Sequence, residues 1–167
     1  MKKTLGVIPA RMASSRFPGK PLEKILGIPM LAHCYERALL SKACDKLVIA
    51  TPDKEIMNWA KNHEIPVILT GHHHKRATER AQETLDILSE QGETYDFILL
   101  LQGDEPQIFP DDIKNLSDAF CGSELEIVNL VYPINGDDLD NPSVVKAIMS
   151  NTSKISFFTR AHVPNRS

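Results

Sequence analysis

Short apolar runs alternate with amphipathic segments along the whole chain. Most of the apolar runs are continuous rather than alternating, which is typical of strands that are covered on both faces. They predict strands at 5–8, 46–50, 66–69, 97–101 and 126–132, and two further pieces, 147–150 and 155–158, are expected to be antiparallel or at an edge. The strand pattern thus extends over nearly the full length.

The segments between these runs have the spacing of amphipathic helices. Helices are predicted at 29–42, 53–63, 78–92 and 110–122. The last begins at Pro110, has acids in its first turn and stops at Gly122, which suits the helix dipole and a helix C-terminus. Because strands and helices alternate, we expect a mainly parallel sheet in a three-layer α/β/α, Rossmann-like fold, with ligands at the carboxyl ends of the strands.

Composition narrows the class of protein. The 167 residues, 42% of them apolar, predict a single domain over 1–167. The net charge of -3 argues against a nucleic-acid binder. Three cysteines without a CxxC pair indicate neither a disulfide framework nor a zinc site, so a reducing cytoplasm is expected. No stretch reaches the roughly 18 apolar residues of a membrane span, so no membrane insertion is predicted.

A basic loop follows the first predicted strand, within "VIPARMASSRFPGKPL" at 7–22. Arg11, Arg16 and Lys20 can neutralise phosphate charges, Gly19 permits close backbone approach, and Ser14 offers hydroxyl and amide donors. The loop matches neither GxxxxGK[ST] nor GxGxxG. We predict a site for a small anion, with a triphosphate as the first candidate. The alternative is a solvated basic loop that proline only stiffens.

A second polar group stands at the end of the strand predicted at 97–101. There "LLLQGDEPQI" runs from a buried strand into Gln102, Gly103, Asp104 and Glu105. An acid at this end of the sheet, opposite a phosphate loop, is where Mg²⁺ bridging phosphates would be held, and Asp104 is the favoured ligand. The alternative is a solvated acidic turn made by Gly103 and Pro106.

Five motifs together resemble the 3-deoxy-manno-octulosonate cytidylyltransferase (CMP-Kdo synthetase) family, within the sugar-acid cytidylyltransferases. They are "IPARMASSRFPGKPL", "TER" at 78–80, "LQGDEP" at 101–106, "NPSVVKAIM" at 141–149 and "FFTRAHVP" at 157–164. The first is shared with CMP-sialic acid synthetases, whereas "LQGDEP" with "NPSVVK" indicates the branch that uses 3-deoxy-manno-octulosonate (Kdo). The resemblance implies that the expected α/β/α fold is the variant found in nucleotidyltransferases. It also implies that the protein is cytoplasmic.

The implied reaction is a Mg²⁺-dependent transfer of CMP from CTP to Kdo, with release of pyrophosphate, for lipopolysaccharide or capsule synthesis. By resemblance, Arg11, Arg16 and Lys20 would bind the CTP phosphates, with Pro9, Ala10 and Ser14 beside the nucleotide. Thr78, Arg80 and Gln102 would hold the cytidine, Asp104 the metal, and Arg160 the sugar carboxylate. Arg11, Lys20 and Asp104 would carry the catalysis. The alternatives are a CMP-sialic acid type or related acidic-sugar transferase, and a non-catalytic nucleotide-binding module.

The chain departs from the family pattern in two places. Arg76-Ala77 stands where the family usually has Ser-Gly before the Thr-Glu-Arg motif, so a bulky cation replaces a small hydroxyl residue. Members of the family also continue beyond "TRAHVPNRS", which predicts that a C-terminal segment is missing. By resemblance, the full-length protein is expected to be a homodimer, and that segment would make much of the dimer contact. The neighbouring "GHHHK" is expected to be an exposed loop; metal binding there is the alternative.

Overall fold

The computed structural model describes residues 2–13 and 17–162, which fall into two compact units. Unit 1 extends to Val128 and unit 2 begins at Asn129. Unit 1 holds the main sheet and unit 2 holds a separate pair of strands.

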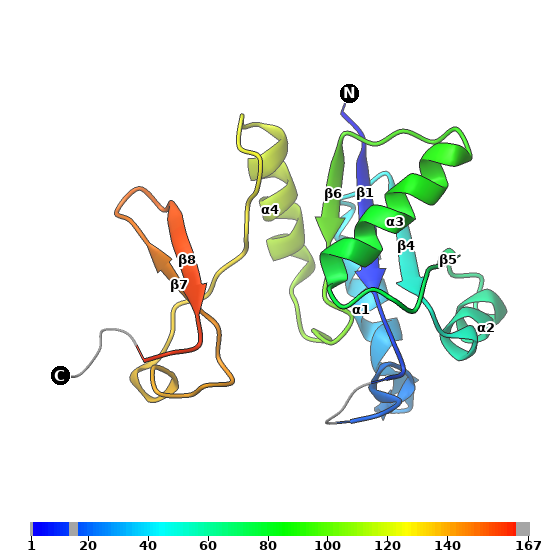
Figure 1. The fold of residues 1–167 in the computed structure, drawn as a ribbon, viewed down its shortest axis with the longest axis horizontal. Helices are drawn as coiled ribbons and strands as arrows, with labels where there is room; N and C mark the ends of the chain where they lie inside the picture. The colour runs from blue at the N-terminus through cyan, green and yellow to red at the C-terminus, as the bar shows by residue number, and fades with distance from the viewer. Residues whose placement is uncertain (1, 14–16, 163–167) are drawn as a thin grey trace. The chain divides into compact units, whose positions relative to one another are not determined.

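Unit 1 is built on a four-stranded parallel sheet in the order β5-β4-β1-β6 (Figure 1). The strands are β1 (Thr4–Pro9), β4 (Lys46–Thr51), β5 (Val67–Leu69) and β6 (Phe97–Leu100). All three pairings are parallel, with Val7 opposite Val48 on one side and Leu100 on the other. The parallel sheet and four of the predicted strands are confirmed, and the shared direction brings the carboxyl ends of all four to one edge.

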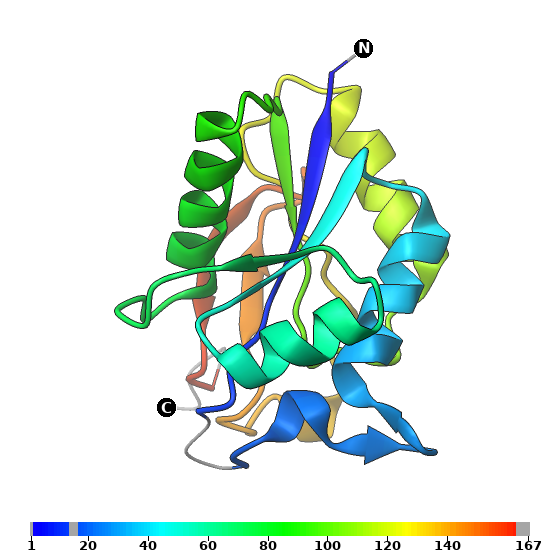
Figure 2. The ribbon, with the colours of Figure 1, turned by 90° about the vertical axis from the view of Figure 1, so that its right-hand side faces the viewer.

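Four helices cover the sheet: α1 (Met30–Ser41), α2 (Lys54–Asn62), α3 (Ala77–Glu90) and α4 (Pro110–Cys121). Successive strand residues face opposite sides. Ile8 and Ile49 therefore share a buried cluster with residues of α1, α2 and α4, whereas Val7 and Val48 pack with residues of α3. Figure 2 shows α3 on one side of the sheet and α1 with α4 on the other. The predicted three-layer arrangement is confirmed.

A small hairpin between β1 and α1 was not predicted. It follows a 3-10 turn, η1 (Lys20–Leu22), and pairs β2 (Lys24–Ile25) with β3 (Ile28–Pro29). Leu26 and Gly27 form its tip with φ of 51° and 85°. A two-residue strand is too short for hydrophobic periodicity to reveal.

Unit 2 contains the 3-10 turn η2 (Gly136–Asp138) and an antiparallel pair, β7 (Lys146–Met149) and β8 (Ile155–Thr159). The two late antiparallel pieces are thus confirmed. The strand predicted at 126–132 is wrong: within the described chain this segment forms no strand. Ile127 and Tyr132 are 79% and 91% exposed. An apolar run becomes a strand only when a neighbouring strand takes its backbone hydrogen bonds.

No helix among the described residues is long and apolar enough to cross a membrane. Cys34, Cys44 and Cys121 are free thiols, as the absence of a disulfide pattern predicted.

Candidate functional site

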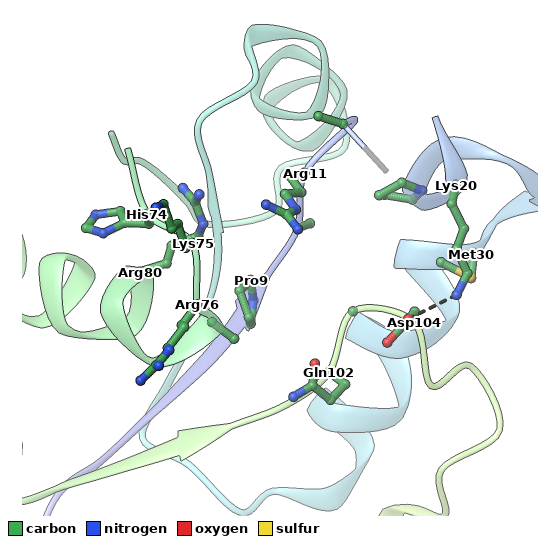
Figure 3. Close-up of a pocket in the computed structure, with 15 residues that line it drawn as sticks. Pro9, Arg11, Lys20, Met30, His74, Lys75, Arg76, Arg80, Gln102 and Asp104 are labelled. Carbon is green, nitrogen blue, oxygen red and sulfur yellow. Dashed lines mark hydrogen bonds and ion pairs between the residues drawn. The ribbon is translucent and has the colours of Figure 1, made fainter. Parts of the chain in front are cut away.

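A cavity of about 340 Å³ opens where β1 and β6 end (Figure 3). Its walls come from the end of β1, from η1, from the turn after β6 and from the segment leading into α3. Seven of the residues predicted from the sequence line it together: Pro9, Ala10, Arg11, Lys20, Arg80, Gln102 and Asp104. The fold thus brings the basic loop and the acidic turn into one site.

Four predicted residues are not placed in this cavity. Ser14 and Arg16 lie outside the described residues. Thr78 is exposed in the first turn of α3 and is not part of the lining. Arg160 belongs to unit 2, where its Nη1 donates to the carbonyl oxygens of Pro142 at 3.2 Å and Ser143 at 2.7 Å.

Gly103 allows the turn after β6 to approach the end of β1. A Cβ at this position would lie 2.9 Å from the carbonyl oxygen of Pro9, closer than real Cβ atoms come to backbone. Just before it, the Leu101 amide donates to Val7 O at 3.0 Å, and the Leu101 side chain is buried in the core. Gln102 and Asp104 on either side of the glycine are thereby held at the cavity.

Lys20 and Asp104 form an ion pair across one wall, with Nζ 3.0 Å from Oδ2. Gly19, which precedes Lys20, has a φ of 79°. The Gly19 amide donates to Met12 O at 3.0 Å, and this bond closes the basic loop. The two side chains are 37% and 54% exposed. An exposed pair of this kind contributes only about 0–1 kcal/mol, so a phosphate or a cation can compete for either partner.

Arg80 is the buried cation of the site, with 4% of its surface exposed. Its Nη1 donates to Thr70 Oγ1 and, at 3.2 Å, to Gly71 O. Burial lowers the pKa of Arg80, and the neighbouring Arg11 lowers it further, while Glu83 and Asp53 act in the opposite direction. An anion in the cavity would relieve the repulsion between the two guanidinium groups.

The wall leading into α3 carries polar and basic side chains to which the sequence motifs assigned no role. His74, Lys75 and Arg76 line the cavity beside Arg80, and Figure 3 shows them across from Lys20 and Asp104, with Arg11 between the two sides. Arg76, the bulky cation that stands where the family usually has serine, is thus part of the pocket lining.

Two glutamates of α3 hold this wall through its backbone. Glu79 accepts the amides of Lys75 at 2.9 Å and Arg76 at 3.1 Å. Glu83 accepts the Gly71 amide at 2.8 Å and lies 2.5 Å from His74 Nε2. The sequence signal for the first contact is a glutamate at the third position of a helix, which is half of a capping box.

The acidic side of the cavity suits a cation that is shared with a bound polyphosphate. Among the described residues there is no group of three or more His, Cys, Asp or Glu side chains that could hold a metal, the histidine run included. Among the described residues that line the cavity, Asp104 is the single carboxylate, and it is exposed. Mg²⁺ keeps several waters and takes one or two carboxylates plus phosphate oxygens, so this residue fits a metal ion that is shared with a bound polyphosphate.

Covalent chemistry through a cysteine does not fit the site. Cys34 is buried in α1, and burial raises the pKa of its thiol to about 11. A thiol in that state is not a nucleophile at neutral pH. The site instead offers cations, one carboxylate and backbone, which is the inventory for holding an anionic substrate in place.

Comparisons with known proteins match the chain over nearly its whole length. The family model described as cytidylyltransferase matches residues 5–167. The 3-deoxy-manno-octulosonate cytidylyltransferase of Parabacteroides distasonis is 36% identical over 169 residues. The 8-amino-3,8-dideoxy-manno-octulosonate cytidylyltransferase of Shewanella amazonensis is 37% identical over 161 residues. These alignments cover 98% and 95% of this chain.

A solved structure agrees with the sequence relatives. A CMP:2-keto-3-deoxy-manno-octonic acid synthetase complexed with CTP superposes with a TM-score of 0.82 at 30% identity, over 98% of this chain. The chain spans 65% of the length of each of the two curated relatives and 66% of the solved one.

Proposed function

Because the chain belongs to the cytidylyltransferase family, we propose that its cavity binds CTP and that the protein transfers CMP to a 3-deoxy sugar acid. The observation that carries the proposal is the convergence of Arg11, Lys20, Arg80 and Asp104 on one cavity at the carboxyl ends of β1 and β6. A solved relative of this fold is a complex with CTP, which supports the choice of nucleotide.

Arg11 and Lys20 neutralise the CTP phosphates, together with Arg16 of the same loop. Arg80 and Gln102 hold the cytidine, with Pro9 and Ala10 as backbone beside it. Asp104 would release Lys20 to the phosphates and would hold Mg²⁺. That ion, when bound, neutralises charge that develops on the phosphate oxygens.

The reaction needs no protein nucleophile. The anomeric hydroxyl oxygen of the sugar acid attacks the α-phosphorus of CTP, the bond to the β-phosphate oxygen breaks, and pyrophosphate leaves. The hydroxyl proton passes to solvent. Positioning and charge neutralisation supply most of the rate of such transfers, which matches a site made of cations and backbone.

We propose Kdo as the acceptor and Arg160 as the residue that meets its carboxylate. The two carbonyl contacts of Nη1 fix one edge of the Arg160 guanidinium, and its other donors can form a bidentate pair with a carboxylate. The similar identity to an 8-amino-3,8-dideoxy-manno-octulosonate cytidylyltransferase favours an amino sugar acid as the second candidate. Both acceptors present a carboxylate, so Arg160 serves either.

The test is pyrophosphate release by this chain with Mg²⁺, with CTP compared against UTP and ATP. Kdo and its 8-amino-8-deoxy analogue are offered in separate reactions. We expect release that requires CTP and one of the sugar acids. Arg160→Ala is the matched variant and should raise KM for the sugar acid while leaving CTP binding unchanged.

Calorimetric titration of CTP alone separates binding from chemistry. Tight binding of CTP without release of pyrophosphate would indicate a non-catalytic nucleotide-binding module, which is one of the alternatives that the sequence leaves open. Release with UTP or ATP at the same rate would contradict the cytidine assignment of Arg80 and Gln102. Absence of CTP binding would overturn the proposed function.

A further inference from the structure

Asp53, between β4 and α2, contacts the start of the basic loop. It follows β4 and precedes α2, where its position is that of the helix N-cap. Its side chain makes no capping hydrogen bond to the helix. Its Oδ2 instead accepts the backbone amide of Met12 at 2.7 Å, a contact between residues 41 apart in the chain. A carboxylate at an N-cap position ordinarily accepts an amide of the first turn of its own helix, whereas the Asp53 carboxylate accepts an amide of the loop.

The contact fixes the backbone on the C-terminal side of Arg11. On the N-terminal side, the Ala10 amide donates to Ala50 O at 2.9 Å, which extends the β1 and β4 pairing. Beyond Arg11, Met12 is tied twice: its amide to Asp53 and its carbonyl to the Gly19 amide at 3.0 Å. The backbone on both sides of Arg11 is therefore held, and the direction of its side chain into the cavity follows.

The carboxylate is also anchored from its own backbone. The Asp53 amide donates to Thr51 Oγ1 at 3.2 Å, and Thr51 is fully buried. Thr51 O in turn accepts the amide of Thr70, whose hydroxyl accepts from Arg80. One hydrogen-bonded path thus joins the basic loop to the buried cation of the opposite wall.

The charge of Asp53 does not explain its place beside an anion site. It acts to raise the pKa of Arg80, so its field reaches the cavity, and a negative charge there opposes the binding of phosphate. What the carboxylate offers the site is a strong, short hydrogen bond to the Met12 amide. Geometry is the contribution that favours the ligand.

We propose that Asp53 is a positioning residue for nucleotide binding: by holding the Met12 amide it sets the direction of Arg11 toward the phosphates. The inference rests on the proposed binding of CTP. Small displacements of a positioned cation are costly for polyphosphate recognition, since each contact depends on orientation.

The experiment compares Asp53→Ala, Asp53→Asn and Glu55→Ala in the complete chain. Asn keeps an oxygen that can accept the Met12 amide but removes the charge. Glu55 is an exposed acid in the first turn of α2, so Glu55→Ala is the matched control for loss of a helix-terminal charge. Calorimetric titration with CTP, and with inorganic tripolyphosphate as a base-free probe, gives the affinities. Hydrogen exchange of the Met12 amide reports the contact itself.

We expect Asp53→Ala to weaken binding of both probes at least about tenfold and to speed exchange at Met12. Asp53→Asn should bind CTP as tightly as the wild type or more tightly, with Met12 still protected. Glu55→Ala should stay within about twofold of the wild type.

Wild-type affinity in a folded Asp53→Ala variant would overturn the proposal, as would an Asn variant as weak as the Ala variant. If Asp53→Ala does not fold, the Asn variant and the exchange rate in the wild type decide: an unprotected Met12 amide contradicts the contact. If the wild type binds no CTP, the proposed function fails. Met12 protection that persists in Asp53→Asn and is lost in Asp53→Ala would still support the anchoring role.

Discussion

The two units of the chain differ in how their apolar side chains are used. In unit 1 the strands bury both faces, and Ile8, Val7, Val48 and Ile49 are all fully buried. In unit 2 the two-stranded pair leaves Phe157 and Phe158 more than half exposed. A sheet with two covered faces supports a rigid cavity, whereas an isolated pair of strands is marginal by itself.

The cavity is built within unit 1. The described residues that line the cavity all lie in unit 1. Within that unit the Gly103 backbone closely approaches Pro9 O, and the Met12 amide donates to the side chain of Asp53. Arg160, the candidate for the acceptor, is held in unit 2 by two local carbonyls. Nucleotide binding should thus be robust to changes in unit 2.

The largest contrast is expected from truncating one apolar residue in each unit. Ile49→Ala removes a fully buried side chain from the unit 1 core and should destabilise the fold by about 3–4 kcal/mol. Phe157→Ala, at a side chain 54% exposed, should cost less than about 1 kcal/mol. Urea unfolding followed by far-UV circular dichroism, to which the secondary structure of both units contributes, measures both losses. The fluorescence of Trp59, the single tryptophan, which packs on the unit 1 core, follows unit 1 separately. Equal losses would show that unit 2 is packed as unit 1 is.

A second contrast uses two glycines. Gly103→Ala would place a Cβ 2.9 Å from Pro9 O, so the turn or β1 must shift. We expect a loss of about 1–3 kcal/mol in stability and weaker CTP binding. Gly136→Ala in unit 2 meets no atom within 4 Å and should change stability by less than about 0.5 kcal/mol. Thermal unfolding and CTP titration of both variants provide the check, and a neutral Gly103→Ala would contradict the close approach.

A third contrast separates the cations of the two units. Arg11→Ala or Lys20→Ala should weaken CTP binding by about 10- to 150-fold, because each variant loses charge-assisted hydrogen bonds of about 1.5–3 kcal/mol. Both are loop residues at the cavity, so the midpoint of unfolding should hardly move. Arg160→Ala should leave the CTP affinity unchanged. CTP binding that is lost in Arg160→Ala and kept in Arg11→Ala would reverse the assignment of the two units.

The sequence predicted the parts of this arrangement that depend on hydrophobic period or on a compact motif. The continuous runs became β1, β4, β5 and β6 because both faces of the sheet are covered. The motif around Arg11 and the motif around Asp104 were each recognised, and a parallel sheet then brings their strands to one edge.

Long-range polar contacts and missing partners account for what was not predicted. Asp53 has the sequence signature of an ordinary helix N-cap, and its contact with Met12 depends on the pairing of β1 with β4. Residues 126–132 have the composition of a strand, but strand formation needs a neighbouring backbone that local sequence does not specify. Lys75 and Arg76 reach the cavity only because α3 begins beside it.

The smallest effect concerns acid pH and the wall of the cavity. Burial raises the pKa of Glu83, but the Gly71 amide and His74 outweigh it, so its pKa lies below the usual range. A carboxyl with a lowered pKa in the fold stabilises the fold fully above its unfolded pKa of about 4.3, and that contribution is lost as the pH falls through the lowered value. The protection of the Gly71 amide, taken as its exchange rate relative to the intrinsic rate at the same pH, should therefore decrease at acid pH, and Glu83→Gln should flatten that dependence. A pH profile identical in the two proteins would contradict the contact.

The claim that unit 1 holds the nucleotide site by itself is tested most directly by calorimetric titration of CTP into residues 1–128 and into the complete chain, with Mg²⁺ present. We expect dissociation constants that agree within about threefold, because the described residues that line the cavity all lie in unit 1. Binding by residues 1–167 with none by folded residues 1–128 would contradict this claim.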